Sequence, residues 1–238
     1  WKLIEEAYHY YEEDPSRSQE FLAEALKLDP ENLDAKQMLL TFQSPLEHLK
    51  GLIALEKEQR SKWDQGPKMG WANLDERPYL SLKYNLAKFY LSNSMKRFAI
   101  KEFEEILEID VQDHMGVRYE LMATYCNLEE FDKAKSFFEC ERMEYHEEDL
   151  MIVPMMTVSL MTGHIEDADF YFDLLYAKNP EFENYLKMIE QGDEERLVAE
   201  TLKVNPILFE ANSMQSLLMV FNQVVDLSQS EYYFTWLI

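Results

Sequence analysis

Glycine, cysteine and basic side chains are scarce in this sequence of 238 residues, and each shortage excludes a class of protein. Six isolated glycines cannot supply a phosphate-cradling loop. Two cysteines, Cys126 and Cys140, are too few for a secreted disulfide scaffold of this size, so we expect reduced thiols in a cytoplasmic protein. The longest apolar run, Met151 to Met161, is too short to span a bilayer and contains Pro154.

Charge is also strongly one-sided, with 23 Lys and Arg against 46 Asp and Glu and a net charge of −23. Nucleic acids and anionic membranes both attract basic patches, so we expect neither as a partner. The acids are spread along the whole chain, which favours a solvated acidic surface. Steering of a basic partner and mimicry of nucleic acid remain open alternatives.

What the sequence does contain is an internal repeat typical of helices. A small residue recurs at Ala99, Ala134 and Ala168, in steps of 35 and 34, and a phenylalanine follows each alanine four positions later. This is the tetratricopeptide (TPR) pattern, in which a small residue lets two antiparallel helices approach and an aromatic residue fills the gap to the next pair. One such pair cannot bury both of its faces, so we expect the pairs to stack.

We therefore predict an all-α fold, a TPR-like right-handed superhelix (α-solenoid) of about five helical hairpins with a C-terminal helical cap. It would form one domain over residues 1–238, with two degenerate hairpins in 1–62, an insertion in 63–77, three clear TPR units in 78–180 and the cap in 181–238. Toward the two ends of the chain, we expect helices at 32–42, 45–62, 181–191, 193–203, 206–224 and 230–238.

Three short motifs carry a resemblance to a known family. They are Trp71-x5-Arg77-Pro78-Tyr79, Asp113-x2-Gly116-Val117-Arg118-Tyr119 and Asn179-Pro180-x4-Tyr185-Leu186. Together they resemble the bacterial TPR proteins related to the suppressor-of-tumorigenicity-seven family, from about Glu5 to the C-terminus and most closely from Trp71 to Pro180. The resemblance implies a TPR-like scaffold and transfers no catalytic residue; Val111 departs from it, since TPR units often close with proline there.

Motifs for catalysis or metal binding are missing from the sequence. It holds no HExxH, no GxSxG, no GxxxxGK[ST] and no His/Cys cluster with zinc spacing. The segment from His146 to Asp149 could meet a metal, but a solvated acidic turn explains it better. We expect no enzyme activity, no metal and no cofactor.

The best candidates for binding lie where helices of successive repeats would line a concave groove. These candidates are Arg77, Tyr84, Lys88, Arg118, Tyr119 and Asn127. Arginine and lysine there could grip the carboxylates of an acidic or C-terminal peptide, and tyrosine could pack along its backbone. The alternative for Arg77 and Arg118 is a structural one, in which they tie adjacent hairpins to acids such as Asp113 or Glu120.

These features predict a non-catalytic scaffold that binds a peptide or protein segment of another protein in its groove. One alternative is a self-associating scaffold, such as a homodimer, that pairs through the apolar C-terminal residues Leu217, Leu218, Phe221 and Trp236. A weaker alternative is a hydrolase whose site the motifs do not reveal.

Overall fold

The computed structural model describes residues 2–63, 68–140, 147–192, 199–204, 209–224 and 231–238. Within these ranges the chain forms helices and turns and no strand, so the predicted all-α class is confirmed. The chain divides into two compact units, 1–117 and 118–238, which we describe separately. That they form the single domain expected from the sequence stays a prediction. Among the described residues, no helix is both long enough and apolar enough to cross a membrane.

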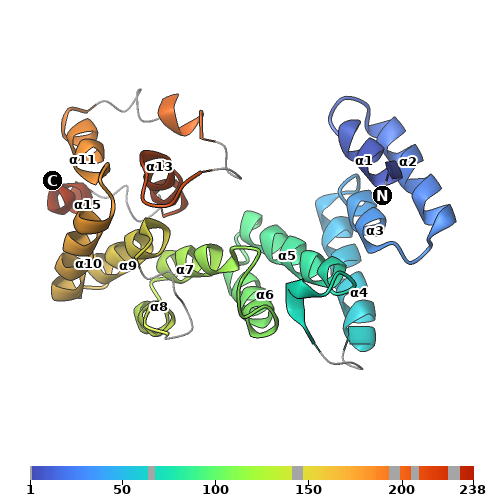
Figure 1. Ribbon diagram of the computed structural model, residues 1–238, viewed down its shortest axis with the longest axis horizontal. Helices are drawn as coiled ribbons and strands as arrows, with labels where there is room; N and C mark the ends of the chain where they lie inside the picture. The colour runs from blue at the N-terminus through green and yellow to red at the C-terminus, as the bar shows by residue number, and fades with distance from the viewer. Residues whose placement is uncertain (1, 64–67, 141–146, 193–198, 205–208, 225–230) are drawn as a thin grey trace. The chain divides into compact units, whose positions relative to one another are not determined.

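The first unit contains the hairpins that the sequence predicts for residues 1–62, followed by the best repeat. Its elements are α1 (Lys2–His9), α2 (Pro15–Leu28), α3 (Leu33–Leu40), α4 (Pro45–Trp63), the 3-10 turn η1 (Gly70–Ala72), α5 (Arg77–Ser92) and α6 (Lys96–Ile109) (Figure 1). The helices expected at 32–42 and 45–62 are thus confirmed within two residues. The predicted insertion contributes η1, while its Gly66 and Pro67 lie outside the described residues.

Side chains at the helix ends explain where α2 and α3 begin. The Asp14 carboxylate accepts a hydrogen bond from the Arg17 backbone amide (3.1 Å), and Pro15 occupies the first turn of α2. Asn32 caps α3 in the same way, accepting from the Ala35 amide at 2.9 Å. Both caps satisfy amides that an α-helix leaves without an internal partner, and so fix each start in the sequence.

Helix α4 runs antiparallel to α5. The His48 ring, near the start of α4, lies 4.9 Å from the Phe89 ring near the end of α5. At the opposite end, the rings of Trp63 and Tyr79 lie 4.7 Å apart, where α4 ends and α5 begins.

Helix α4 also runs antiparallel to α3. Gly51, in the first half of α4, packs so closely on Leu40 at the end of α3 that an added Cβ would lie 2.3 Å from Leu40 Cδ2. Lys62, at the end of α4, pairs with Glu31 just before α3 at 2.6 Å. Because both α3 and α5 are antiparallel to α4, they run parallel to each other, and they are in contact.

The second unit is built around a helix that is buried on all sides. Its elements are α7 (Val117–Asn127, of which Val117 belongs to the first unit), α8 (Phe131–Phe138), α9 (Asp149–Met161), α10 (Ile165–Lys178), α11 (Phe182–Glu190), α13 (Met214–Gln223) and α15 (Glu231–Leu237). Residues 149–160 of α9 are all buried, and α8, α10 and α13 pack against it (Figure 1). Its uniformly apolar sequence is therefore that of a core helix.

The predicted C-terminal helices need one correction. The helix expected at 206–224 begins at Met214, because Ser213 caps it in a reciprocal arrangement with Ser216, and residues 209–212 are not helical. The predictions at 181–191 and 230–238 are confirmed as α11 and α15 within two residues. Most of the helix expected at 193–203 lies outside the described residues.

The repeated small residues are all buried, and their role between the two helices of a TPR hairpin stays a prediction. Ala99, Ala134 and Ala168, in α6, α8 and α10, have no exposed surface. The consecutive helices α5 and α6 pack against each other, as do α9 and α10. Because interiors are closely packed, a side chain larger than alanine at these buried positions would disturb the packing around it.

Candidate functional site

The first unit contains a cleft of about 500 Å³ formed by α3, α4 and α5 together with the end of α1. We call it the α3–α5 cleft. It is lined by Tyr8, Tyr11, Asp34, Gln37, Met38, Thr41, His48, Leu52, Asn85, Lys88, Phe89 and Ser92. Five of these twelve residues are aromatic or aliphatic and seven are polar, so the cleft combines apolar contact area with many hydrogen-bonding groups.

Two of the helices present matching stripes to the cleft. The positions are Asp34, Gln37, Met38 and Thr41 on α3, and Asn85, Lys88, Phe89 and Ser92 on α5. Both sets have the spacing i, i+3, i+4, i+7 that places residues on one helix face. The cleft is therefore the space between the equivalent faces of two parallel helices.

One hydrogen bond sets the alignment of these stripes. Asn85 Nδ2 donates to Gln37 Oε1 at 2.8 Å, and Gln37 is buried. Asp34 lies one turn before Gln37, and Lys88 lies one turn after Asn85. Since the helices are parallel, Asp34 and Lys88 lie on opposite sides of the amide pair, about 9 Å apart along the helix axes at about 1.5 Å per residue.

Partial burial in the cleft perturbs several of its titratable groups. Burial raises the pKa of the Asp34 carboxyl and lowers the pKa of His48, so both are biased toward their neutral forms. Burial also raises the pKa of Tyr8, and the nearby Asp34 and Tyr11 raise it further. Tyr8, Tyr11 and Asp34 therefore lie close together at one end of the cleft.

Of the predicted binding residues in the first unit, Lys88 lines this cleft and its side chain is exposed. Tyr84 is half-buried, with its ring 6.3 Å from that of Phe103. Arg77 donates from Nε to the Trp71 carbonyl (2.8 Å), and its guanidinium lies 5.2 Å from the Trp71 ring. These contacts hold the turn before α5. They go to Trp71, whereas the structural alternative joined Arg77 to acids such as Asp113 or Glu120, so that alternative stays a prediction.

The predicted residues of the second unit contact their own chain. Arg118 is buried, with its guanidinium 5.4 Å from the Tyr119 ring, and the Tyr119 hydroxyl donates to the Glu148 carboxylate. Asn127 Nδ2 donates to the backbone carbonyl of Gln223 in α13 at 3.0 Å. The six candidates divide equally between the two units, so a single groove containing all of them stays a prediction.

The apolar C-terminal residues are also used inside the second unit. Leu217, Leu218 and Phe221 are buried, and the Phe221 ring stacks 4.7 Å from Tyr185 of α11. The half-buried Trp236 contacts the Phe172 ring edge-on at 5.6 Å. A dimer formed through Leu217, Leu218 and Phe221 would first require α13 to leave its place against α9.

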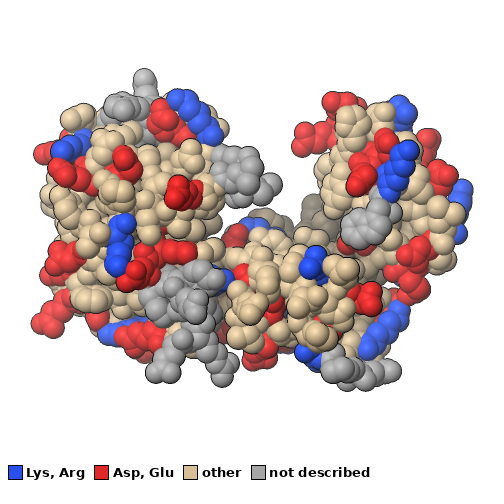
Figure 2. Space-filling view, viewed as in Figure 1, with Lys and Arg blue, Asp and Glu red and all other residues tan. Residues whose placement is uncertain are grey.

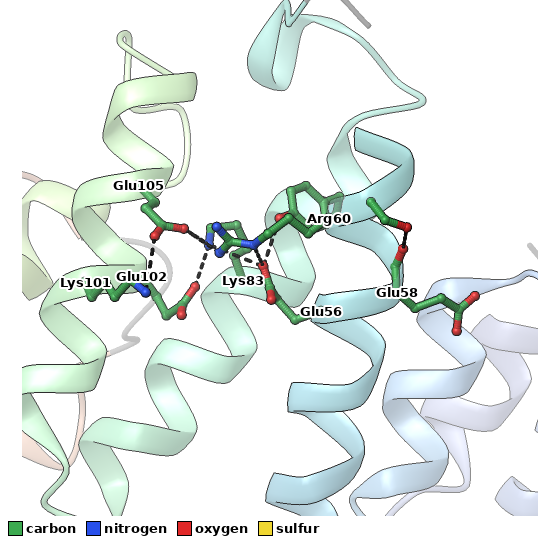
Figure 3. Close-up of polar contacts among 9 residues, drawn as sticks. Glu56, Glu58, Arg60, Lys83, Lys101, Glu102 and Glu105 are labelled. Atoms are coloured by element: carbon green, nitrogen blue, oxygen red, sulfur yellow. Dashed lines mark hydrogen bonds and ion pairs between the residues drawn. The ribbon is translucent and has the colours of Figure 1, made fainter. Parts of the chain in front are cut away.

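Sequence reasoning missed a buried charge network in the first unit. Lys83, with a side chain only 1% exposed, pairs with Glu102 at 2.5 Å and with Glu105 at 2.6 Å. Arg60 pairs with Glu105 at 2.7 Å and with Glu56 at 2.8 Å, which links α4, α5 and α6 (Figure 3). Burial alone would raise the pKa of Glu105, but Lys83 and Arg60 lower it below its usual value. Each of these charged groups lies against a group of opposite charge, which favours a structural role for the network.

A second buried carboxylate, Asp149, organises the second unit, and none of the described basic side chains forms an ion pair with it. It accepts hydrogen bonds from Ser216 Oγ (2.5 Å), Asn179 Nδ2 (2.7 Å) and the amides of Leu150 (3.0 Å) and Asn212 (3.1 Å). Burial raises its pKa, although these donors oppose the shift. The cluster joins the start of α9 to the start of α13, and no local sequence pattern marks it.

Nothing in the described residues points to a metal site. Within the described ranges, no group of three His, Cys, Asp or Glu side chains could hold a metal ion. His146, the histidine of the weak metal motif, lies outside those ranges.

No protein-family model matches this chain, and no curated protein matches it.

Proposed function

We propose that this chain is a TPR-like right-handed helical scaffold that binds a segment of another protein in the α3–α5 cleft, without catalysis. The recurring alanines, their complete burial and the paired helices support the repeat architecture. The resemblance of its motifs to bacterial TPR proteins related to the suppressor-of-tumorigenicity-seven family is part of the same proposal.

The observation that carries the binding proposal is the cleft itself. Its volume of about 500 Å³ lies within the range of about 300–1,000 Å³ that is usual for ligand sites. Aromatic side chains such as Tyr8, Tyr11 and Phe89 offer the large, rigid contact area that dominates binding energy in protein interfaces. The space would hold a few side chains of a bound segment.

Polar groups of the cleft have distinct parts in this proposal. Lys88 binds a carboxylate of the partner, from an acidic side chain or a chain end. Asn85 and Gln37 already bond each other, and their remaining amide groups can pair with the backbone of the segment. The scaffold supplies position and complementarity, and no bond is made or broken.

The proposal is tested by selecting peptides from a random display library with the purified protein. We expect a convergent set, and we expect Lys88→Glu to weaken binding of the synthesised peptides about tenfold or more, equivalent to about 1.4 kcal/mol. Lys57→Glu is the matched control, because Lys57 is exposed on α4 and does not line the cleft. Absence of any convergent set, or an equal loss in both variants, would contradict binding at this cleft.

A further inference from the structure

One end of the α3–α5 cleft combines a carboxylate with aromatic rings. Asp34 comes from the first turn of α3, Tyr8 from the last turn of α1, and Tyr11 from the turn that follows. All three side chains line this cleft, and both Asp34 and Tyr11 add to the effect of burial in raising the pKa of Tyr8. Tyr8 is 64% exposed, so this end of the cleft is open to an incoming group.

Among the described residues, the Asp34 carboxylate differs from the other shielded acids of the first unit in that it forms neither an ion pair nor a hydrogen bond. Glu56, Glu102 and Glu105 each pair with Lys83 or Arg60, and the Glu76 carboxylate accepts hydrogen bonds from the Gly70 amide and its neighbours. In the described part of the chain, no basic side chain forms an ion pair with Asp34, and its only resolved perturbation is burial. A partly desolvated carboxylate in this state gains free energy when a cation reaches it.

The surroundings of Asp34 also suit a cation. Tyrosine rings attract ammonium and guanidinium groups, and the first unit already uses this interaction, with the Arg17 guanidinium 4.0 Å from the Tyr10 ring. Residues 1–40 carry ten Asp and Glu against four Lys and Arg. This local surplus of negative charge would attract a basic segment toward the cleft.

We propose that the Asp34 end of the cleft, formed with Tyr8 and Tyr11, is a subsite for a lysine or arginine side chain of the bound partner segment. This inference rests on the proposed function and names the chemistry of the partner. The basic side chain lies against Asp34 and the tyrosine rings, while Lys88, at the other end of the cleft, faces an acidic group. The opposite charges of the segment are then about three residues apart if it is extended, at about 3.3 Å per residue. This polarity fixes the direction in which the segment lies.

The test repeats the peptide selection with wild type, Asp34→Asn, Asp34→Lys and the control Glu24→Lys. Glu24 is an exposed acid on α2 that does not line the cleft, so its reversal changes net charge equally. We expect wild type and Glu24→Lys to enrich Lys or Arg at one fixed position, and Asp34→Asn to lose that enrichment. Asp34→Lys should enrich Asp or Glu there, and should weaken binding of wild-type-selected peptides at least tenfold.

Several results would overturn the proposal. A convergent set without a fixed basic position, or basic enrichment that survives in Asp34→Lys, would refute the subsite while leaving peptide binding intact. No convergent set for wild type would refute the proposed function as well. Self-association of wild type that Asp34→Lys abolishes, measured by sedimentation, would assign the cleft to a second copy of the chain instead. Circular dichroism of each variant separates these outcomes from misfolding, and Asp34→Asn, nearly isosteric, guards against it.

Discussion

In the first unit, the equivalent faces of α3 and α5 border an open cleft, whereas in the second unit α7 and α9 meet helices of their own chain. Asn127 of α7 bonds the end of α13, and Thr157 of α9 shares a 2.8 Å hydrogen bond with Tyr233 of α15. Both units are built from helical hairpins, so the hairpin pattern does not decide whether such a face is open. What decides it is the C-terminal segment of the second unit, because its helices α13 and α15 contact α7 and α9.

The two units also stabilise buried acids differently. The first, with 15 Lys and Arg against 22 Asp and Glu, pairs three internal carboxylates with Lys83 and Arg60, while Glu76, Asp110 and Asp113 accept from backbone amides. The second, with 8 against 24, holds Asp149 through four neutral donors of the described residues. Acidic side chains are scattered over the surface of each unit (Figure 2). The second unit has few cations to place inside, and neutral hydrogen bonds take that role.

Removing residues 205–238 should have the largest effect, because it takes away the helices that α7 and α9 contact in the second unit. This truncation deletes four buried apolar side chains of α13, namely Leu217, Leu218, Val220 and Phe221. At about 1.5–3 kcal/mol for each, the loss is on the order of 6–12 kcal/mol, comparable to the whole stability of a domain.

Hydrogen exchange measured by mass spectrometry checks this truncation. We expect the amides of α9 to lose their protection, while those of α5, whose contacts within the first unit are unchanged, serve as the internal reference. Unchanged protection in α9 would mean that α13 adds little to the second unit.

Features set by residues close together in the sequence were predictable, whereas contacts between residues far apart in the sequence were not. The helices and the alanine positions follow from patterns within about 35 residues, and these were predictable. The ion pair of Lys83 with Glu102 spans 19 residues, the bond of Asp149 with Ser216 spans 67 and that of Asn127 with Gln223 spans 96. None repeats or has a characteristic spacing, so no pattern could reveal them.

The candidate site was predictable only in part, for the same reason. The helical stripe that would line a groove includes Lys88, which does line the α3–α5 cleft. Tyr8 and Asp34 belong to the degenerate hairpins, where the repeat signal is too weak to assign a concave face. Tertiary packing brings them to the cleft, and only the structure shows it.

Asp149→Asn should destabilise the second unit by about 2 kcal/mol. Each carboxylate oxygen accepts two hydrogen bonds, from Leu150 and Asn212 on one side and from Asn179 and Ser216 on the other. Whichever way the new amide turns, its NH₂ group faces two donors, and an unsatisfied buried donor costs about 1–3 kcal/mol. Urea unfolding monitored within α9 measures the loss; a variant as stable as wild type would show that the donors find other acceptors.

Asp34→Asn, the same substitution in the first unit, should have the smallest effect and the opposite sign. We expect it to raise the free energy of unfolding by about 0.3 kcal/mol at pH 7. Burial raises the pKa of Asp34 above its usual 3.8, so the ionised carboxylate disfavours the folded state at every pH above its folded pKa. The advantage of the variant should therefore shrink as the pH falls through that pKa, and vanish below 3.8, where wild-type Asp34 is neutral both folded and unfolded. Urea midpoints compared at pH 7 and at pH 3.5 measure this difference, and a variant less stable than wild type at pH 7 would contradict it. If Asp34→Asn both stabilises the free protein and abolishes selection for a basic side chain, the role of Asp34 is to bind the ligand, at a cost in stability. The role of Asp149, in contrast, is to stabilise the fold.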